Sequence, residues 1–184
     1  MSPVVLVATE CDGKINFAPQ GQYGTVIAKP EVIYISVIKE HLTAQNILKT
    51  KNFSINIPDE IVIEKIKQCG SVSGREEDKS KIFKTFYSKT RVPMIEECKV
   101  NYVCEVVREL EIEYCYMFFG EIKETYVNKN CITGELPDIT KIEPLLCTID
   151  GKLWTINNKV VEYGHTSPNR SVCFAAKAAR APFA

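Results

Sequence analysis

The sequence predicts a mainly β protein, in which a β-barrel carries a few short helices. Strand-like runs are joined by two short helical stretches and then follow one another, so the alternation that a doubly wound sheet needs is not sustained. The 184 residues, 45% hydrophobic and 25% charged, suit one globular core. We therefore expect a single domain over residues 1–174 and a frayed, Ala-rich tail at 175–184.

The first elements form a predicted hairpin. Val4–Thr9 is a β-branched apolar run, Asp12-Gly13 is a turn pair that tolerates positive φ, and Ile15–Ala18 is the returning strand. The Gly- and Gln-containing stretch Pro19–Gly24 is expected to be a loop.

A buried strand and a helix follow. Val32–Ile38 is almost continuously apolar, which indicates burial on both faces or a place inside a barrel. Thr43–Thr50 is expected to form a short helix, with Thr43 as its cap. Phe53–Pro58 alternates apolar and polar residues as a strand does, and Asp59 can cap a second helix.

The rest of the chain is expected to be mostly β. Gly70–Lys81 is a charged loop, Val100–Val107 a strand, and Ile112–Tyr126 a longer strand bent near Gly120. The last expected β segments are Cys131–Gly134, Leu145–Ile149, Leu153–Ile156 and Val160-Val161.

Charge and targeting signals exclude several classes. Lys and Arg together equal Asp and Glu, so the formal net charge of zero gives no global reason to bind nucleic acid or an anionic membrane. The run Val4–Ala8 is too short for a secretory signal, and no stretch has transmembrane length, so we expect a cytoplasmic protein. Reduced thiols are the expected state of the eight cysteines, none of which forms a CxxC pair.

Standard catalytic signatures are missing, and two histidines cannot build a multi-histidine metal site, so no catalytic or metal-ligating residue is predicted. Three polar segments remain next to strand ends: Asn16–Pro19, Ser36–Asn46 and Ser71–Lys79. Taken singly, each has an ordinary interpretation as a strand end, a strand–helix connection or a solvated loop.

Taken together, the segments resemble the flavin reductase-like family, and within it the flavoredoxin branch. The most specific match is Ser73–Lys79, which is similar to the family's SGRxxDK stretch. The resemblance covers about residues 3 to 156 and is strongest in the first 80. The other matching segments are Pro3–Thr9, Asp12-Gly13, Asn16–Pro19, Ser36–Lys39, Thr43–Ile47 and Phe53–Pro58.

The resemblance implies an FMN-binding split β-barrel with a few short helices, which forms a homodimer with flavin sites near the subunit interface. It implies three groups of cofactor-binding residues. The ring would be lined by Asn16, Phe17, Ala18 and Pro19. The ring edge, ribityl chain and phosphate would be approached by Ser36, Val37, Lys39, Thr43 and Asn46. The phosphate end would be closed by Ser73, Gly74 and Lys79.

The chemistry of FMN agrees with these assignments. Its phosphate is a dianion that needs N–H and hydroxyl donors and a cation, and a helix N-terminus is a suitable place. Thr43 at the expected helix start, with Lys39 just before it, supplies such a place. The Gly- and Pro-containing stretch Pro19–Gly24 allows close backbone approach to a flat ring.

Three positions concern how closely the sequence follows the family pattern. Ser80 follows Lys79 where the family usually has Phe, and Phe83 comes later. Tyr23 is the nearest candidate for an aromatic that flanks the flavin in some relatives. Trp154, in a region where the family often has an aromatic, is assigned to core or dimer packing.

Several functions stay open at this stage. An FMN protein of this kind is either a flavoredoxin-type electron carrier, reduced by a redox protein, or an NAD(P)H-dependent flavin or ferric reductase. A non-redox ligand-binding split barrel is the alternative from another class. A thiol-based redox role would centre on Cys11 or Cys131, which have the most loop-like settings.

Overall fold

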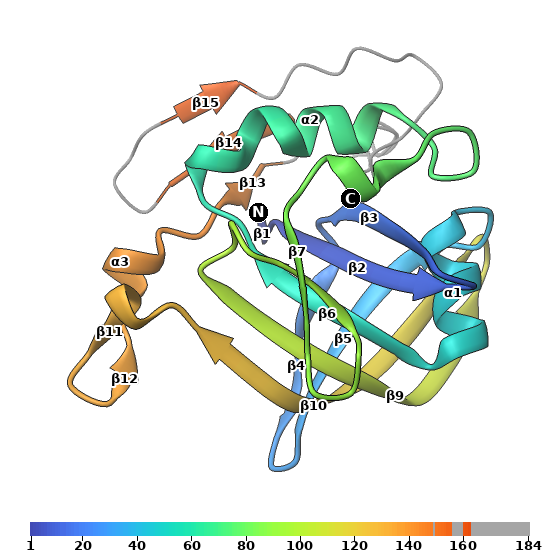
Figure 1. Ribbon diagram of the computed structural model, residues 1–184, viewed down its shortest axis with the longest axis horizontal. Helices are drawn as coiled ribbons and strands as arrows, with labels where there is room; N and C mark the ends of the chain where they lie inside the picture. Colours follow the sequence, from blue (N-terminus) through green and yellow to red (C-terminus); the bar gives the residue numbers. More distant parts are fainter. Residues whose placement is uncertain (149, 156–159, 163–184) are drawn as a thin grey trace, which may run out of the picture.

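The computed structural model describes residues 1–148, 150–155 and 160–162, and the expected tail at 175–184 lies outside them. Within these residues the main feature is a curved, antiparallel seven-stranded sheet in the order β3-β2-β6-β9-β10-β5-β4 (Figure 1). Its strands are β2 (Val5–Cys11), β3 (Lys14–Gln20), β4 (Tyr23–Ala28), β5 (Glu31–Ile38), β6 (Asn52–Ile57), β9 (Val100–Ile112) and β10 (Cys115–Val127).

Smaller elements surround this sheet. The helices are α1 (Leu42–Thr50), α2 (Ile63–Ser71) and α3 (Ile139–Ile142), with 3-10 turns η1 (Glu60–Val62), η2 (Lys79–Lys81) and η3 (Lys129–Cys131). The short strands are β1 (Ser2–Pro3), β7 (Thr85–Tyr87), β8 (Pro93–Ile95), β11 (Ile132–Thr133), β12 (Leu136–Pro137), β13 (Leu146–Cys147), β14 (Lys152–Trp154) and β15 (Val160–Glu162). Among the described helices, none is long and apolar enough to cross a membrane.

The sheet curls into a barrel, so that β3 at one end comes close to β5 near the other end. The Gln20 side-chain amide at the end of β3 donates to the backbone carbonyl of Ser36 on β5. The Ser36 N–H in turn donates to the Gln22 carbonyl at 3.0 Å. The strand bend expected near Gly120 is confirmed, because the β9–β10 register shifts between Phe119 and Gly120.

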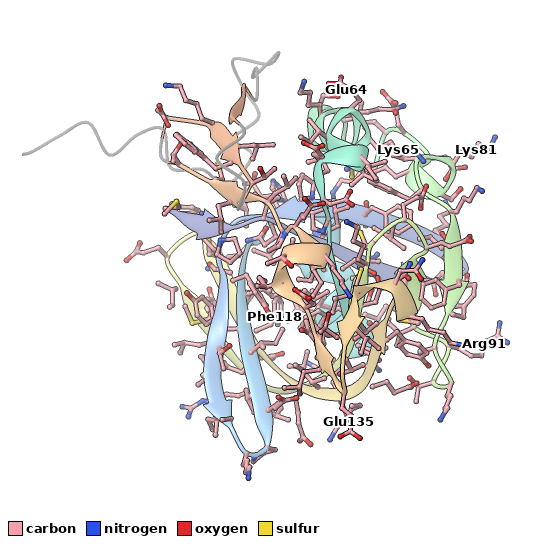
Figure 2. All side chains as sticks on the ribbon, turned by 90° about the vertical axis from the view of Figure 1, so that its left-hand side faces the viewer. Glu64, Lys65, Lys81, Arg91, Phe118 and Glu135 are labelled. Carbon is pink, nitrogen blue, oxygen red and sulfur yellow. The ribbon has the colours of Figure 1, made fainter. Side chains whose placement is uncertain are left out.

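Two apolar cores lie on opposite sides of β2, whose side chains alternate between them. Val5 and Val7 face the barrel interior, where Phe118 is fully buried (Figure 2). Leu6 and Ala8 face a second core beneath α2, which lies across β2 and β3 (Figure 1). The strand is therefore buried on both faces.

The predicted first hairpin is confirmed. β2 and β3 pair from Val5–Gln20 to Cys11–Lys14, and Asp12 and Gly13 link them with φ of 52° and 72°. Successive positive φ values are those of the tight turns that match the twist of paired strands.

Three sequence predictions about local structure are wrong. The segment Pro19–Gly24 is not a loop, because β3 continues through Gln20 and β4 starts at Tyr23. Thr43 does not cap α1, since the helix begins at Leu42 with His41 as its N-cap. Ile112 ends β9 and does not begin the next strand.

Candidate functional site

A buried polar cluster joins the first two of the three sequence motifs. The Asn16 amide on β3 donates to the Thr43 hydroxyl on α1 at 2.9 Å. The Asn46 amide, one turn later on α1, donates to the Thr9 hydroxyl on β2 at 3.0 Å. Thr9 and Asn16 are cross-strand partners. We call Thr9, Asn16, Thr43 and Asn46 the polar cluster; it fixes α1 against the first hairpin with its polar groups paired.

The third motif covers this cluster at Gly74. A Cβ on Gly74 would lie 2.1 Å from Asn16 Oδ1, closer than real Cβ atoms come, and 3.1 Å from Leu42 Cδ2, which is a tight contact. Any larger residue would displace the Asn16 amide or the loop. The three segments singled out by the sequence therefore converge at Asn16, although 58 positions separate it from Gly74.

Arg75 ties the same loop to the corner between β5 and α1. Its guanidinium donates to the Glu40 carbonyl at 3.1 Å. Within the loop, the Ser73 carbonyl accepts the N–H groups of Glu76 and Glu77 at 3.0 and 2.9 Å. The SGR stretch thus forms a tight turn held against the start of α1.

The start of α1 is suited to an anion. The nine-residue helix has no acidic residue in its first turn, and its N-cap His41 makes no side-chain cap hydrogen bond. The first N–H groups of a helix have no intrahelical acceptor, and the helix dipole makes that end positive. An uncapped, acid-free first turn is the usual setting for a bound phosphate.

The other predicted site residues are placed differently. Ala18, Pro19 and Ser36 are half-buried on the strands beside the cluster. The Phe17 and Val37 side chains are almost fully buried in the two cores, so these residues can offer a ligand only backbone groups.

The two predicted cationic residues are held by other protein groups. The Lys39 ammonium pairs with Glu111 on β9 and lies 5.5 Å from the centre of the Tyr116 ring. The Lys79 ammonium is buried and donates to the backbone carbonyls of Cys69 and Phe17, at 2.7 and 3.2 Å.

Thr9 and Gln20 were not predicted. Thr9 is the polar residue at the end of an otherwise apolar run. That change from apolar to polar was the sequence signal that could have pointed to it. The role of Gln20 depends on a contact with β5 that forms only when the sheet curls.

Aromatic residues near the barrel take packing roles. Tyr23 on β4 packs against the barrel core, and burial raises the pKa of its hydroxyl to about 12. Trp154 is half-buried on β14, opposite Leu146.

The seven cysteines in the described part of the chain are free thiols. Cys131 is buried, whereas Cys11 is partly exposed and its sulfur lies 3.6 Å from Asp12 Oδ2. Burial raises the pKa of the Cys98 and Cys104 thiols well above their ordinary value, so both are protonated and unreactive at neutral pH.

Comparison with known proteins identifies the family. The model of the flavin reductase like domain matches residues 1–146. The crystal structure of flavoredoxin from Methanosarcina acetivorans is 35% identical, covers 91% of this chain and 89% of its own, and has a TM-score of 0.81. Flavoredoxin of Desulfovibrio vulgaris (Miyazaki F) is 24% identical over 95% of this chain and 92% of its own, with a TM-score of 0.73.

A curated relative is less informative. An uncharacterized protein of Aquifex aeolicus (strain VF5) is 28% identical over 134 residues, which are 65% of this chain and 67% of the relative. The chain belongs to the flavin reductase-like family, and its fold is the split β-barrel that the resemblance implied.

Proposed function

We propose that the chain binds one FMN per subunit and transfers electrons through it. The convergence of Asn16, Thr43 and Gly74 from three distant segments beside the uncapped start of α1 carries this proposal. Family membership and the 35% identity to a flavoredoxin support it.

The donors around the start of α1 fit the phosphate end of FMN. First-turn N–H groups, the Ser73 hydroxyl and the Arg75 guanidinium lie on segments that meet there. The opposite end of the cofactor would lie along the backbone of β3 near Asn16 and Ala18. There the Gly74 backbone packs against the Asn16 amide, and the missing side chain leaves that amide in place.

Bound FMN would supply one- and two-electron transfer, so the protein's task is to hold and orient it. The polar cluster would fix the β3 backbone relative to α1. No side chain of the proposed site needs to act as a general base.

The visible spectrum of purified protein after addition of FMN tests this function. We expect a bound-flavin spectrum that bleaches under anaerobic reduction. A protein that takes up no FMN overturns the proposal and favours a non-redox ligand-binding module.

The electron donor separates the two redox functions. We favour a flavoredoxin-type carrier, because the flavoredoxin from M. acetivorans is 35% identical over nearly the full length of both chains. Anaerobic NADH or NADPH should then leave the flavin oxidised, whereas a reduced ferredoxin-type protein should bleach it. Rapid bleaching by NAD(P)H would instead establish a reductase.

A homodimer is the proposed assembly. The outer face of β4, β5, β9 and β10 exposes large apolar side chains, among them Ile27, Leu110 and Ile112 at 43–49%. Leu110 lies opposite the half-buried Met117, and Ile112 lies opposite Cys115. Several exposed apolar side chains on one sheet face are typical of a protein–protein contact.

A further inference from the structure

Lys79 is a buried cation whose ammonium contacts backbone carbonyls. The residue begins η2, directly after the loop that carries Gly74 and Arg75, and only 6% of its surface is exposed. Its ammonium donates to the Cys69 carbonyl at 2.7 Å and to the Phe17 carbonyl at 3.2 Å. Burying a charged amine is costly unless strong acceptors replace water, so this placement needs both carbonyls.

The Cys69 carbonyl belongs to the last turn of α2. Carbonyls in that turn have no intrahelical donor, and a cation is favoured beside them by the helix dipole. Lys79 therefore fixes the end of α2, from which the Ser73–Asp78 loop departs.

The Phe17 carbonyl lies on β3, one residue from Asn16. It accepts a second hydrogen bond, from the Cys69 thiol at 3.1 Å. Burial raises the pKa of this thiol to about 11, against the opposing charge of Lys79, so the thiol keeps its proton at neutral pH and can donate.

The Phe17 ring is held as firmly as its carbonyl. It packs edge-on against Phe83, with ring centroids 5.2 Å apart and an interplanar angle of 76°. Phe83 follows η2, so Lys79 and Phe83, which lie four residues apart at the end of the SGRxxDK motif and just after it, contact the carbonyl and the ring of Phe17. Residues 79–83 thereby add to the β2 pairing and the Asn16–Thr43 bond in fixing β3 next to Asn16.

We propose that Lys79 is a positioning residue for the cofactor site: its ammonium locks the Phe17 carbonyl and the end of α2 together. In this role it aligns Asn16 with Thr43 and Gly74 without contacting the phosphate. The inference rests on the proposed FMN function, and it gives Lys79 another role than the phosphate contact that the family resemblance implies.

The test compares FMN with riboflavin, which lacks the phosphate, in wild type and Lys79→Met. A positioning role predicts that both flavins bind more weakly by the same factor, about tenfold for loss of a charge-assisted hydrogen bond. A loss confined to FMN would show a phosphate contact and overturn the proposal. The matched control is Lys81→Met, whose exposed ammonium lies on the same turn and points away from the molecule (Figure 2).

Two further readouts separate this role from a merely structural one. Lys79→Met can have a lower melting temperature than wild type and still be folded at the assay temperature. If it then binds both flavins as tightly as wild type does, the proposal is overturned. If that variant does not fold, Cys69→Ala removes the other donor to the Phe17 carbonyl. It should weaken both flavins by about threefold, as expected for a weaker neutral hydrogen bond. Unchanged affinity in Cys69→Ala would then contradict the assignment.

Failure of the underlying function gives a different result. A wild-type protein that binds neither flavin overturns the proposed function and this assignment with it. A wild-type protein that binds FMN, alongside a folded Lys79→Met of equal affinity, overturns the assignment alone.

Discussion

Asn16 shows how one residue can depend on three parts of the chain. Its amide nitrogen is held by Thr43, its oxygen faces the Gly74 backbone, and its backbone lies beside the Phe17 carbonyl that Lys79 binds. The buried amide of Asn16 is therefore held by a hydrogen bond on one side and close packing on the other. Substitutions around it should therefore affect ligand binding more than their size suggests.

Gly74→Ala tests the close approach of the loop. The added Cβ would meet Asn16 Oδ1 at 2.1 Å, so the amide must leave Thr43 or the loop must lift. We expect FMN affinity to fall about tenfold, equivalent to about 1.4 kcal/mol. Fluorescence titration measures it, with Glu77→Ala on the exposed side of the same loop as the control. Equal affinity in Gly74→Ala and wild type would contradict the proposed placement of the cofactor.

Thr9→Val tests the buried polar cluster. The change keeps the side-chain shape but leaves the Asn46 amide without its acceptor, which should reduce the free energy of unfolding by about 1–3 kcal/mol. Urea denaturation measures the loss. Thr25→Val, at an exposed position on β4, should change stability by less than about 0.5 kcal/mol. A fully stable Thr9→Val would mean that the Asn46–Thr9 bond contributes nothing.

At the scale of elements, short sequence patterns predicted the turns and strands that depend on neighbouring residues. The Asp12-Gly13 turn and the apolar run of β5 were readable. Asp59 caps η1, the 3-10 turn that leads into α2, by accepting the Ile61 N–H at 3.0 Å, whereas the N-cap of α2 itself is Val62. β4 was not predicted, because it is a barrel-edge strand whose exposed residues lack a clear alternating pattern. Thr43 was wrongly predicted to be the N-cap of α1. Its hydroxyl instead accepts a hydrogen bond from Asn16, which is 27 residues away in the sequence.

Most of the candidate site could be found from the sequence as segments, and little of it as contacts. Asn16, Thr43, Gly74 and Arg75 were all in the singled-out motifs, and the structure brings them together. The ion pair of Lys39 with Glu111 and the burial of Lys79 depend on which strands become neighbours. Charge alone suggests a phosphate partner, whereas the fold determines which carbonyl or carboxylate is within reach.

Glu97 links α2 to the β7–β8 region and should make stability pH-dependent. Partial burial raises its pKa, but hydrogen bonds from the Lys65 ammonium at 2.5 Å and from the Lys84 N–H outweigh that effect and hold the pKa below its ordinary value of 4.5. A depressed folded-state pKa stabilises the protein above the unfolded-state value. That stability is lost as pH falls through the folded-state pKa.

Urea unfolding of wild type and Glu97→Gln from pH 7 to pH 3 checks this. The variant should be less stable by about 1 kcal/mol at neutral pH, and the gap should close below about pH 4.5. Glu64→Gln is the control, because Glu64 lies exposed on α2 (Figure 2) and its ion pair within the described residues is a surface pair with Lys67. A gap that stays constant over the whole pH range would show that the lost interaction is not ionic.

At the scale of the whole molecule, the outer face of the sheet carries several exposed apolar side chains. The exposed residues Ile27 and Leu110 lie on strands at the β4 and β9 sides of that face. Exposed apolar side chains on a sheet face tend to associate with another surface unless they are covered.

Leu110→Lys combined with Ile27→Lys should therefore convert a dimer to a monomer. The pair of charges would have to be buried without partners, at a cost of several kcal/mol. Size-exclusion chromatography with light scattering gives the mass. Leu136→Lys, on the β11–β12 hairpin, should leave the dimer intact. A wild-type protein of single-chain mass would remove the proposed assembly.

The double burial of β2 has a consequence for how the chain finds its alignment. In a strand with one polar face, a slip of one residue is penalised because polar side chains enter the core. From Val5 to Ala8 every residue of this strand is apolar and buried, so a slipped pairing would still present hydrocarbon to both cores. The Asp12-Gly13 turn and the Thr9–Asn46 and Asn16–Thr43 bonds are then the features that distinguish the native pairing from its neighbours. The groups proposed to organise a cofactor would therefore also fix the register of the hairpin. Loss of both the Thr9–Asn46 and the Asn16–Thr43 bonds should let two registers coexist, which would appear as duplicated amide resonances for β2 and β3 in an NMR spectrum.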